Sequence, residues 1–196
     1  MLYIGVTLMD ETKHWEDLKA GQIQSLQELY NHHINGLYAY GMVLCQDGDR
    51  VKDCIHDLFL NIWNNRQGFS IPTSGKAYLM VSLRRKIFDR GSKRDQMTVP
   101  LEDSGMDHEL SSDAEEQWIR SEEESEVQLK LGQAMAQLSD RQREIIHMKY
   151  YQQMEYEEIA RVMELNYQSA RNLVNRAILV LRKEMITLVM ILLLLM

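Results

Sequence analysis

The chain has few of the residues that interrupt helices or form disulfide bonds: its 196 residues include only two prolines and two cysteines. No Val/Ile/Thr-rich run alternates apolar and polar residues for long enough to suggest a strand, whereas helical spacing recurs throughout. Cys45 and Cys54 are too few for a disulfide framework, so a reduced, cytoplasmic setting is expected. Apolar residues make up 45% of the chain, enough for a core. The predicted fold class is therefore all-α.

Motifs of several enzyme classes are also missing. There is no Gly-rich phosphate loop, and no nucleophile–base pair can be nominated. His32-His33 and Cys54-x-His56 offer ligand atoms, but they do not form a closed set of four with zinc spacing. Adjacent histidines on a helix are moreover expected to point different ways. We therefore predict no catalytic residue, no cofactor and no metal, and do not expect an enzyme.

Neither end of the sequence has the features expected of a signal peptide or of a membrane-spanning helix. The first 13 residues lack a basic n-region and a small-residue cleavage site, so no signal peptide is expected; Met1 and Met9 are alternative starts. The tail, residues 185–196, is almost wholly apolar but shorter than the roughly 20 residues that a membrane span needs. We expect it to pack on its own domain or on a partner.

Charge is distributed unevenly along the chain, whose net value is −7. Residues 96–130 hold 2 Lys/Arg against 11 Asp/Glu, while residues 1–95 hold 12 against 11 and residues 131–196 hold 8 against 7. This pattern predicts an acidic flexible linker at 96–126 between a domain at 10–95 and one at 127–184. A protein that binds DNA through charge alone would be more basic, so help from a larger partner is expected.

Helical spacing predicts six segments before the last motif of the chain. In order, they cover residues 15–21, 22–45, 51–66, 76–94, 127–137 and 140–151. Ser139 or Asp140 is expected to cap the last of them. The second segment should bury one face, formed by Ile23, Leu26, Leu29, Tyr30, Ile34, Leu37 and Tyr38.

Residues 156–183 predict a helix-turn-helix. The first helix carries an apolar stripe of Tyr156, Ile159, Ala160 and Met163. The stripe on the second consists of Ala170, Leu173, Val174, Ala177, Ile178 and Leu181. Amides and guanidiniums occupy the opposite face of the second helix, where they could read base edges in a major groove. The residues expected to do so are Gln168, Ser169, Arg171, Asn172, Asn175 and Arg176. An ordinary helical hairpin with a solvated polar face is the alternative.

The segment 51–66 separates two faces. Its inward face consists of Val51, Ile55, Leu58, Phe59 and Ile62, and its outward face of Asp53, His56, Asp57 and Leu60. A leucine among carboxylates on an outward face suggests a partner surface, although single exposed leucines are common.

A loop at 67–75 leads into a helix whose end is strongly basic. Tyr78 and Phe88 accompany Arg84, Arg85 and Lys86. Basic groups and aromatics together suit a nucleic-acid strand that is being opened. The alternative is a solvated helix end stabilised by the macrodipole.

Three stretches in this order resemble the sigma-70 family of RNA polymerase sigma factors, of the extracytoplasmic-function (ECF) type. They are DCIHDLFLNIW (53–63), KAYLMVSLRRKIFD (76–89) and the run from Leu138 to Lys183. The segment NYQSARNLVNRA (166–177) and the apolar tail look most like those of sigma factors from Bacteroidetes-type bacteria. Two departures stand out: many members have Gln in place of His56 and Asn in place of Arg85.

The resemblance implies two helical domains, sigma-2 and sigma-4, and a set of partners. Segment 51–66 would dock on the clamp coiled coil of the largest polymerase subunit through the outward face named above. Residues 67–94, including Tyr78, Arg84, Arg85 and Lys86, would recognise and melt the minus-ten promoter element, with a flipped base held in a pocket. The helix-turn-helix would read the minus-thirty-five element. An anti-sigma factor, often membrane-anchored in this family, is a further implied partner.

Two other functions remain open on the sequence. A stand-alone helix-turn-helix regulator would bind promoters without polymerase. An interaction protein could act at a membrane through the apolar tail.

Overall fold

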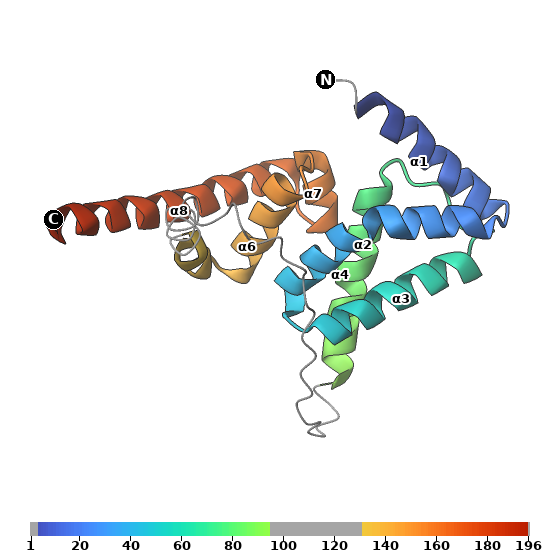
Figure 1. Ribbon diagram of the computed structural model, residues 1–196, viewed down its shortest axis with the longest axis horizontal. Coiled ribbons are helices and arrows are strands. Elements are labelled where there is room, and N and C mark those ends of the chain that lie inside the picture. Colours follow the sequence, from blue (N-terminus) through green and yellow to red (C-terminus); the bar gives the residue numbers. More distant parts are fainter. Residues whose placement is uncertain (1–3, 95–130, 196) are drawn as a thin grey trace, which may run out of the picture.

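The computed structural model describes the backbone of residues 4–94 and 131–195, and side chains of residues 11–89 and 131–183. Every regular element in these ranges is a helix, which confirms the all-α prediction (Figure 1). The N-terminal half contains α1 (Ile4–Lys19), α2 (Ile23–Cys45), α3 (Gly48–Asn64) and α4 (Gly75–Arg94). The C-terminal half contains a short helix at 131–136, α6 (Asp140–Ile146), the π-helix η1 (His147–Tyr151), α7 (Tyr156–Val162) and α8 (Tyr167–Leu195).

The ends of the helices follow local side-chain chemistry. Asp47 caps α3 by accepting from the Arg50 backbone N–H at 3.0 Å, and Ser139 forms a capping box with Gln142 at the start of α6. Ser139, not Asp140, is thus the cap. Three non-glycine residues adopt a left-handed conformation where helices end: Gln46 after α2, Gln153 after η1 and Glu164 after α7 (φ 52°, 53° and 54°).

Two predictions for the first helices are wrong: the residue at which α1 begins, and part of the buried face of α2. Helix α1 begins at Ile4 rather than near Trp15. On α2, Leu29 and Leu37 are buried as predicted, but Ile23 is 56% exposed. Tyr40, which the predicted stripe omitted, is fully buried. The reason is that α2 is covered by α1, α3 and α4 and also by the C-terminal half, so no single stripe describes its buried surface.

Helices α2 and α3 approach closely at a glycine. A Cβ atom built on Gly41 would lie 2.5 Å from Cγ1 and 2.9 Å from Cγ2 of Val51, which is itself completely buried. Any side chain at position 41 would therefore force the two helices apart. The packing places the predicted inward face of α3 in the core, since all five of its residues are buried: Val51, Ile55, Leu58, Phe59 and Ile62.

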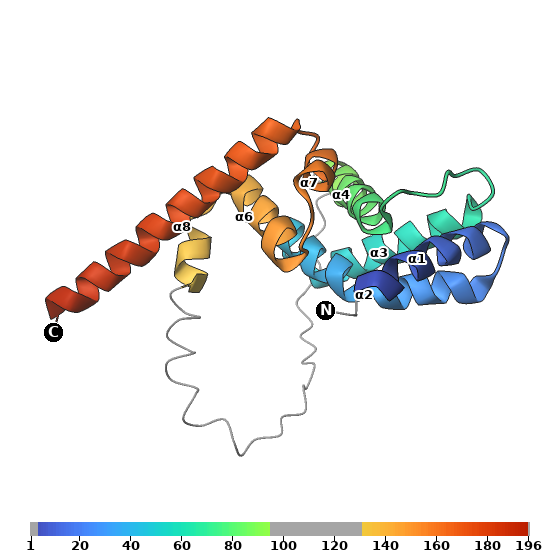
Figure 2. The same ribbon diagram turned by 90° about the horizontal axis from the view of Figure 1, so that it is seen from above.

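The two halves share one apolar core. Helix α2 packs against α6, and α4 packs against α7, so that the C-terminal helices lie against α2 and α4 (Figure 2). Leu83 and Tyr40 from the N-terminal half belong to the same buried cluster as Ile145, Met148 and Ile159 from the C-terminal half. The described residues therefore form a closed arrangement of the two halves.

Helix α8 runs on through the predicted tail without a break and projects away from the rest of the molecule (Figure 1). Side chains beyond Lys183 and the predicted linker at 96–126 lie outside the described residues. Among the described helices, none combines the length and the apolar character needed to cross a membrane.

Candidate nucleic-acid interface

Helices α7 and α8 form the predicted helix-turn-helix. On α7, Ile159, Ala160 and Met163 are buried. They belong to the same cluster as Ala170 and Val174 of α8. The chain turns between the two helices at Glu164, whose left-handed conformation allows the sharp change of direction.

The polar face of α8 is exposed as the sequence predicts. Asn166 precedes the helix and accepts from the Ser169 backbone N–H at 2.7 Å, which fixes the first turn. The Gln168 amide donates to Oδ1 of Asn172 at 3.1 Å, so these two side chains are held side by side. Ser169 is half-buried, and the other predicted base-reading residues are exposed: Gln168, Arg171, Asn172, Asn175 and Arg176.

A cavity of about 230 Å³ lies between this face and α6. Three predicted base-reading residues line it, Ser169, Asn172 and Arg176, together with Arg141 of α6. Arg141 is exposed and adds a second guanidinium beside Arg176. The sequence pattern of α8 gives no sign of Arg141, because Arg141 belongs to a different helix and only the fold brings it to this cavity.

Further along α8, the predicted stripe is correct in part. Ile178 is 37% exposed and so does not belong to the buried face, whereas Leu181 is partly buried and packs, with Val180, on a small cluster. Leu179, outside the stripe, is 63% exposed. Ala177 still contacts the small cluster of Leu138 and Ile146, but α8 then leaves the body of the domain (Figure 2).

The outward face of α3 is on the side opposite the core. Asp53 and His56 are exposed, Asp57 is half-buried and Leu60 is 46% exposed. The structure thus brings together the four residues that the sequence placed on one surface. A hydrophobic side chain flanked by carboxylates is available there for contact with another molecule.

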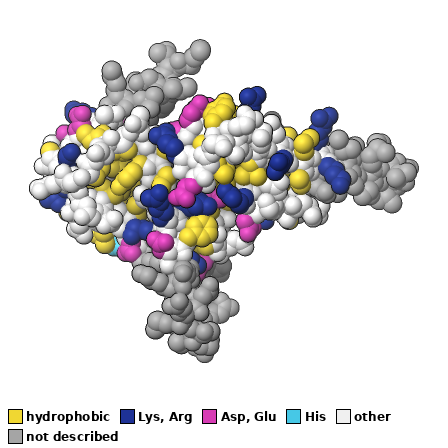
Figure 3. Space-filling model, turned by 180° about the vertical axis from the view of Figure 1, so that it is seen from behind, with side chains coloured by type: hydrophobic (Ala, Val, Ile, Leu, Met, Phe, Trp, Pro, Cys, Tyr) yellow, Lys and Arg dark blue, Asp and Glu magenta, His cyan; other side chains and the backbone are white. Residues whose placement is uncertain are grey.

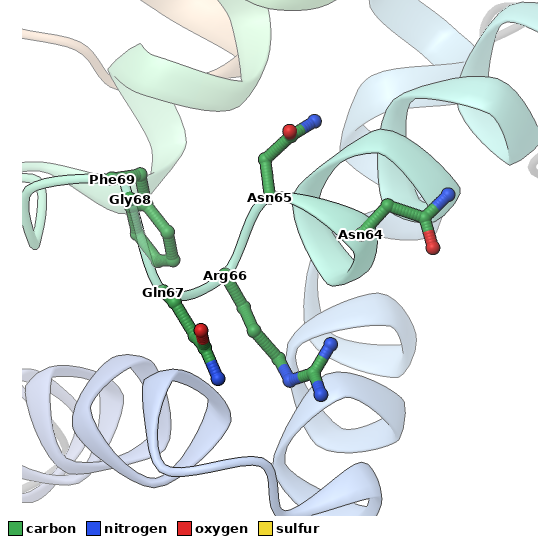
Figure 4. Close-up of a pocket in the computed structure, with 6 residues that line it drawn as sticks. All are labelled: Asn64, Asn65, Arg66, Gln67, Gly68 and Phe69. Carbon is green, nitrogen blue, oxygen red and sulfur yellow. The ribbon is translucent and has the colours of Figure 1, made fainter.

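The loop after α3 lines a cavity of about 550 Å³ (Figure 4). Arg66 is fixed by donating to the Trp63 carbonyl at 2.9 Å while its guanidinium covers the Trp63 ring. Phe69 packs edge-to-face on Trp15, at 5.7 Å between ring centroids, and forms the inner end of the loop. The lining residues are Asn64, Asn65, Arg66, Gln67, Gly68 and Phe69. Their amides can donate and accept hydrogen bonds, as a base edge requires.

The predicted site residues of α4 differ in how exposed their side chains are. Tyr78 is half-buried between Trp15 and Phe69, so its ring takes part in packing. Phe88 is 50% exposed, with the Arg84 guanidinium 4.9 Å from the centre of its ring. Lys86 is half-buried.

Two arginines of α4 pair with the C-terminal half. Arg84 Nε donates to Oε1 of Glu144 at 2.9 Å, and Arg85 forms an exposed ion pair with Glu164 at 3.4 Å. Glu144 is 3% exposed and also accepts from the Tyr40 hydroxyl at 2.8 Å. Burial, and then the negative charge of Glu144, raise the pKa of Tyr40. Figure 3 shows basic and acidic side chains close together in the middle of the opposite face of the molecule.

A second polar link between the halves centres on Gln152. Its amide donates to the Gly36 carbonyl at 3.1 Å and lies 3.1 Å from Nε2 of His147. Lys76 of α4 donates to the Gln152 carbonyl at 3.1 Å. Burial lowers the pKa of His147, so its ring is neutral and Nε2 can accept from Gln152.

Comparison with known proteins gives matches over both halves. Residues 128–181 match the family model described as Sigma-70, region 4. Over 164 residues the chain is 24% identical to RNA polymerase sigma factor YlaC of Bacillus subtilis (strain 168), which covers 82% of this chain and 92% of that protein.

Two solved structures share the fold. CnrH, in complex with the cytosolic domain of CnrY, is 16% identical, with a TM-score of 0.62 over 90% of this chain and 97% of that one. The sigma factor RpoE, in complex with the anti-sigma factor NepR from Bartonella quintana, is 20% identical, with a TM-score of 0.57 over 81% and 95%.

The all-helical fold and the exposed polar face of α8 define a helix-turn-helix protein. Within that class, its C-terminal half is similar to Sigma-70, region 4, and most of the chain is similar to an RNA polymerase sigma factor. The likeness to Bacteroidetes-type sequences is not tested by these comparisons and stays a prediction.

Proposed function

We propose that the protein is an RNA polymerase sigma factor that docks on core polymerase and directs it to promoters. The observation that carries the proposal is the exposed amide and guanidinium face of α8, within the segment that matches Sigma-70, region 4. Residues 10–95 would be the sigma-2 domain, 96–126 the acidic linker, 127–184 the sigma-4 domain and 185–196 the tail. RNA synthesis belongs to the polymerase, so the chain acts in the cytoplasm as a specificity factor and not as an enzyme.

The sigma-4 part would read the minus-thirty-five element through the first three turns of α8. Base contacts fall to the exposed polar residues there, because the later turns carry apolar side chains such as Leu179. Arg141, beside Arg176 at the same cavity, would bind a phosphate and fix the register of α8 on the duplex.

The sigma-2 part would recognise and open the minus-ten element. The cavity after α3, with its amides and Phe69, fits a flipped base that is hydrogen-bonded at its edge and stacked on an aromatic ring. Arg84, Arg85 and Lys86 would hold the backbone of the opened strand, and Phe88 is the exposed aromatic beside them. Tyr78 would support the loop from behind, since it packs on Phe69.

The outward face of α3 would bind the clamp coiled coil of the largest polymerase subunit. Leu60 supplies apolar contact, and the carboxylates around it set specificity and orientation. An anti-sigma factor is a further proposed partner. Support comes from the RpoE structure, in which that sigma factor is bound to the anti-sigma factor NepR.

The deciding experiment is promoter binding and single-round transcription, each with and without core polymerase. We expect transcription with core and only weak, salt-sensitive DNA binding without it, because the two halves carry little net positive charge. Tight and specific promoter binding by the isolated protein would instead identify a stand-alone regulator.

A paired variant tests the docking face. Asp53→Ala with Asp57→Ala should reduce capture of core polymerase and leave the thermal unfolding midpoint unchanged. The matched control is Glu16→Ala with Glu28→Ala, which removes two exposed carboxylates from α1 and α2. Equal capture of core by the two double variants would assign docking to another surface.

A further inference from the structure

Three metal-binding side chains meet at one point between α1 and α2. Nε2 of His33 lies 3.0 Å from Oε1 of Glu11, and the ring of His32 packs edge-to-face on that of His33, with centroids 4.7 Å apart. The ligand atoms of Glu11, His32 and His33 all lie within 4.8 Å of one another. Adjacent histidines were expected to point different ways, and His33 is indeed buried while His32 is exposed, yet the ligand atoms of both lie within 4.8 Å of the Glu11 carboxylate.

The spacing of these atoms is close to that of a metal site. Ligands at 2.0–2.1 Å from a tetrahedral ion are about 3.3 Å apart, so the Glu11–His33 edge already has nearly the right length. The ligand atom of His32 lies within 4.8 Å of the other two, and because His32 is exposed its side chain can move to complete the site. Two imidazoles and one carboxylate suit Zn²⁺, Co²⁺ or Ni²⁺ better than Ca²⁺ or Mg²⁺.

Neighbouring residues hold the ligands in place. Trp15 Nε1 donates to Oε1 of Glu11 at 3.4 Å, in the way that outer residues orient a ligating carboxylate. Gly75 lets the start of α4 pass directly beside Glu11, where a Cβ atom would collide with the carboxylate. His33 is buried, with 5% of its side chain exposed, so one ligand has a fixed position before an ion binds.

The three groups open into a cavity of about 310 Å³ at the junction of the two halves. It is lined by Thr73 and Ser74 of the loop before α4 and by Gln153 and Glu158 of the C-terminal half. The cavity leaves room for water or a fourth ligand on the ion. Glu158 adds a second carboxylate to the lining, and Lys76, whose ammonium is held by the Gln152 carbonyl, adds one positive charge.

We propose that Glu11, His32 and His33 bind one divalent transition-metal ion of the Zn²⁺, Co²⁺ or Ni²⁺ type. The rival explanation is that Glu11 and His33 form a structural ion pair and His32 is an ordinary surface residue. The two explanations differ at His32, which contributes to metal binding only in the first. The site is separate from the proposed promoter and polymerase surfaces, so its failure would leave the sigma-factor function standing.

The test is titration of the full-length, chelator-treated protein with Co²⁺, followed by visible absorption, and then competition with Zn²⁺. We expect one equivalent to bind, with the d–d bands of nitrogen and oxygen ligands. His32→Gln and Glu11→Gln should each weaken binding by about tenfold or more, since even outer residues of metal sites contribute that much. At the same Zn²⁺ concentration, the thermal unfolding midpoint should rise more in the wild type than in His32→Gln.

His14→Gln is the matched control, because it removes a histidine of α1 that lies outside the cluster. It should bind Co²⁺ as the wild type does. Affinity in His32→Gln equal to that of the wild type would overturn the proposal. So would the absence of a one-equivalent site, or a thiolate charge-transfer band, which would assign the ion to Cys45 or Cys54 instead.

Discussion

Arg176 is an exposed guanidinium on the proposed base-reading face of α8. It lies on the α8 face with Asn172 and lines the same cavity as Arg141. Arginine binds guanine through two parallel hydrogen bonds to O6 and N7, from a planar guanidinium of fixed geometry. Its role should therefore depend on one position in the promoter.

Arg176→Ala is expected to lower promoter discrimination by about 1–3 kcal/mol, the value of one bidentate base contact. Single-round transcription on templates mutated one base at a time in the upstream element measures this. Arg182→Ala is the control, because Arg182 is an exposed arginine farther along α8, beyond the first three turns. An equal loss in both variants would indicate general charge attraction in place of base reading.

At the scale of helices, the contact of α2 with α3 depends on the missing side chain of Gly41. Gly41→Ala should destabilise the protein by about 1–3 kcal/mol, as overpacking of a core does. Urea unfolding measures the loss, and adding Val51→Ala should recover part of it. Gly132→Ala is the control, because a Cβ there meets nothing within 4 Å and helix propensity should make it stabilising.

The π-helix η1 carries a pH-sensitive contact. Burial lowers the pKa of His147, so the folded protein keeps this ring neutral at pH values where the unfolded chain protonates it. The contribution of His147 to the free energy of unfolding is fully present above the ordinary histidine pKa of about 6.5, and it is lost as the pH falls below that value. We expect the free energy of unfolding to decline by up to about 1.4 kcal/mol per pH unit in that range.

Unfolding free energies at a series of pH values from neutral to mildly acidic check this. His147→Gln should flatten the curve, whereas His56→Gln, on the exposed face of α3, should leave it unchanged. A wild-type slope that persists in His147→Gln would trace the pH dependence to other groups.

Helical periodicity predicted the described elements well because amphipathic stripes depend on local spacing. The buried face of α3 and most of the α7 and α8 stripes followed from it. Capping preferences narrowed the start of α6 to Ser139 or Asp140, of which Ser139 is the cap. Contacts between distant segments left no such local signal. The burial of Tyr40, the exposure of Ile178, and the meeting of Glu11 with His32 all depend on which helix lies alongside which. The cavity after α3 likewise has no local sequence signal, because it forms only when the loop folds.

For the whole molecule, Glu144 is the residue on which the closed arrangement of the halves depends most. It is buried between Arg84 and Tyr40, both from the N-terminal half. Glu144→Ala should cost about 3 kcal/mol, toward the low end for a broken buried pair because Arg84 remains partly exposed.

The same variant should also let the halves separate, which small-angle X-ray scattering would record as a larger radius of gyration. Glu144→Gln keeps an oxygen that can accept both hydrogen bonds and should change the radius less. If both variants scatter like the wild type, the apolar core alone holds the halves together.

The shared core has a consequence for a chain divided between residues 94 and 131. The two pieces would carry complementary faces and should associate as a heterodimer with a measurable dissociation constant. In the intact chain, a covalent connection of this kind supplies an effective concentration on the order of 1 mM. The ratio of that concentration to the dissociation constant would give the fraction of intact molecules that are closed, and hence how much free energy a partner must supply to open them.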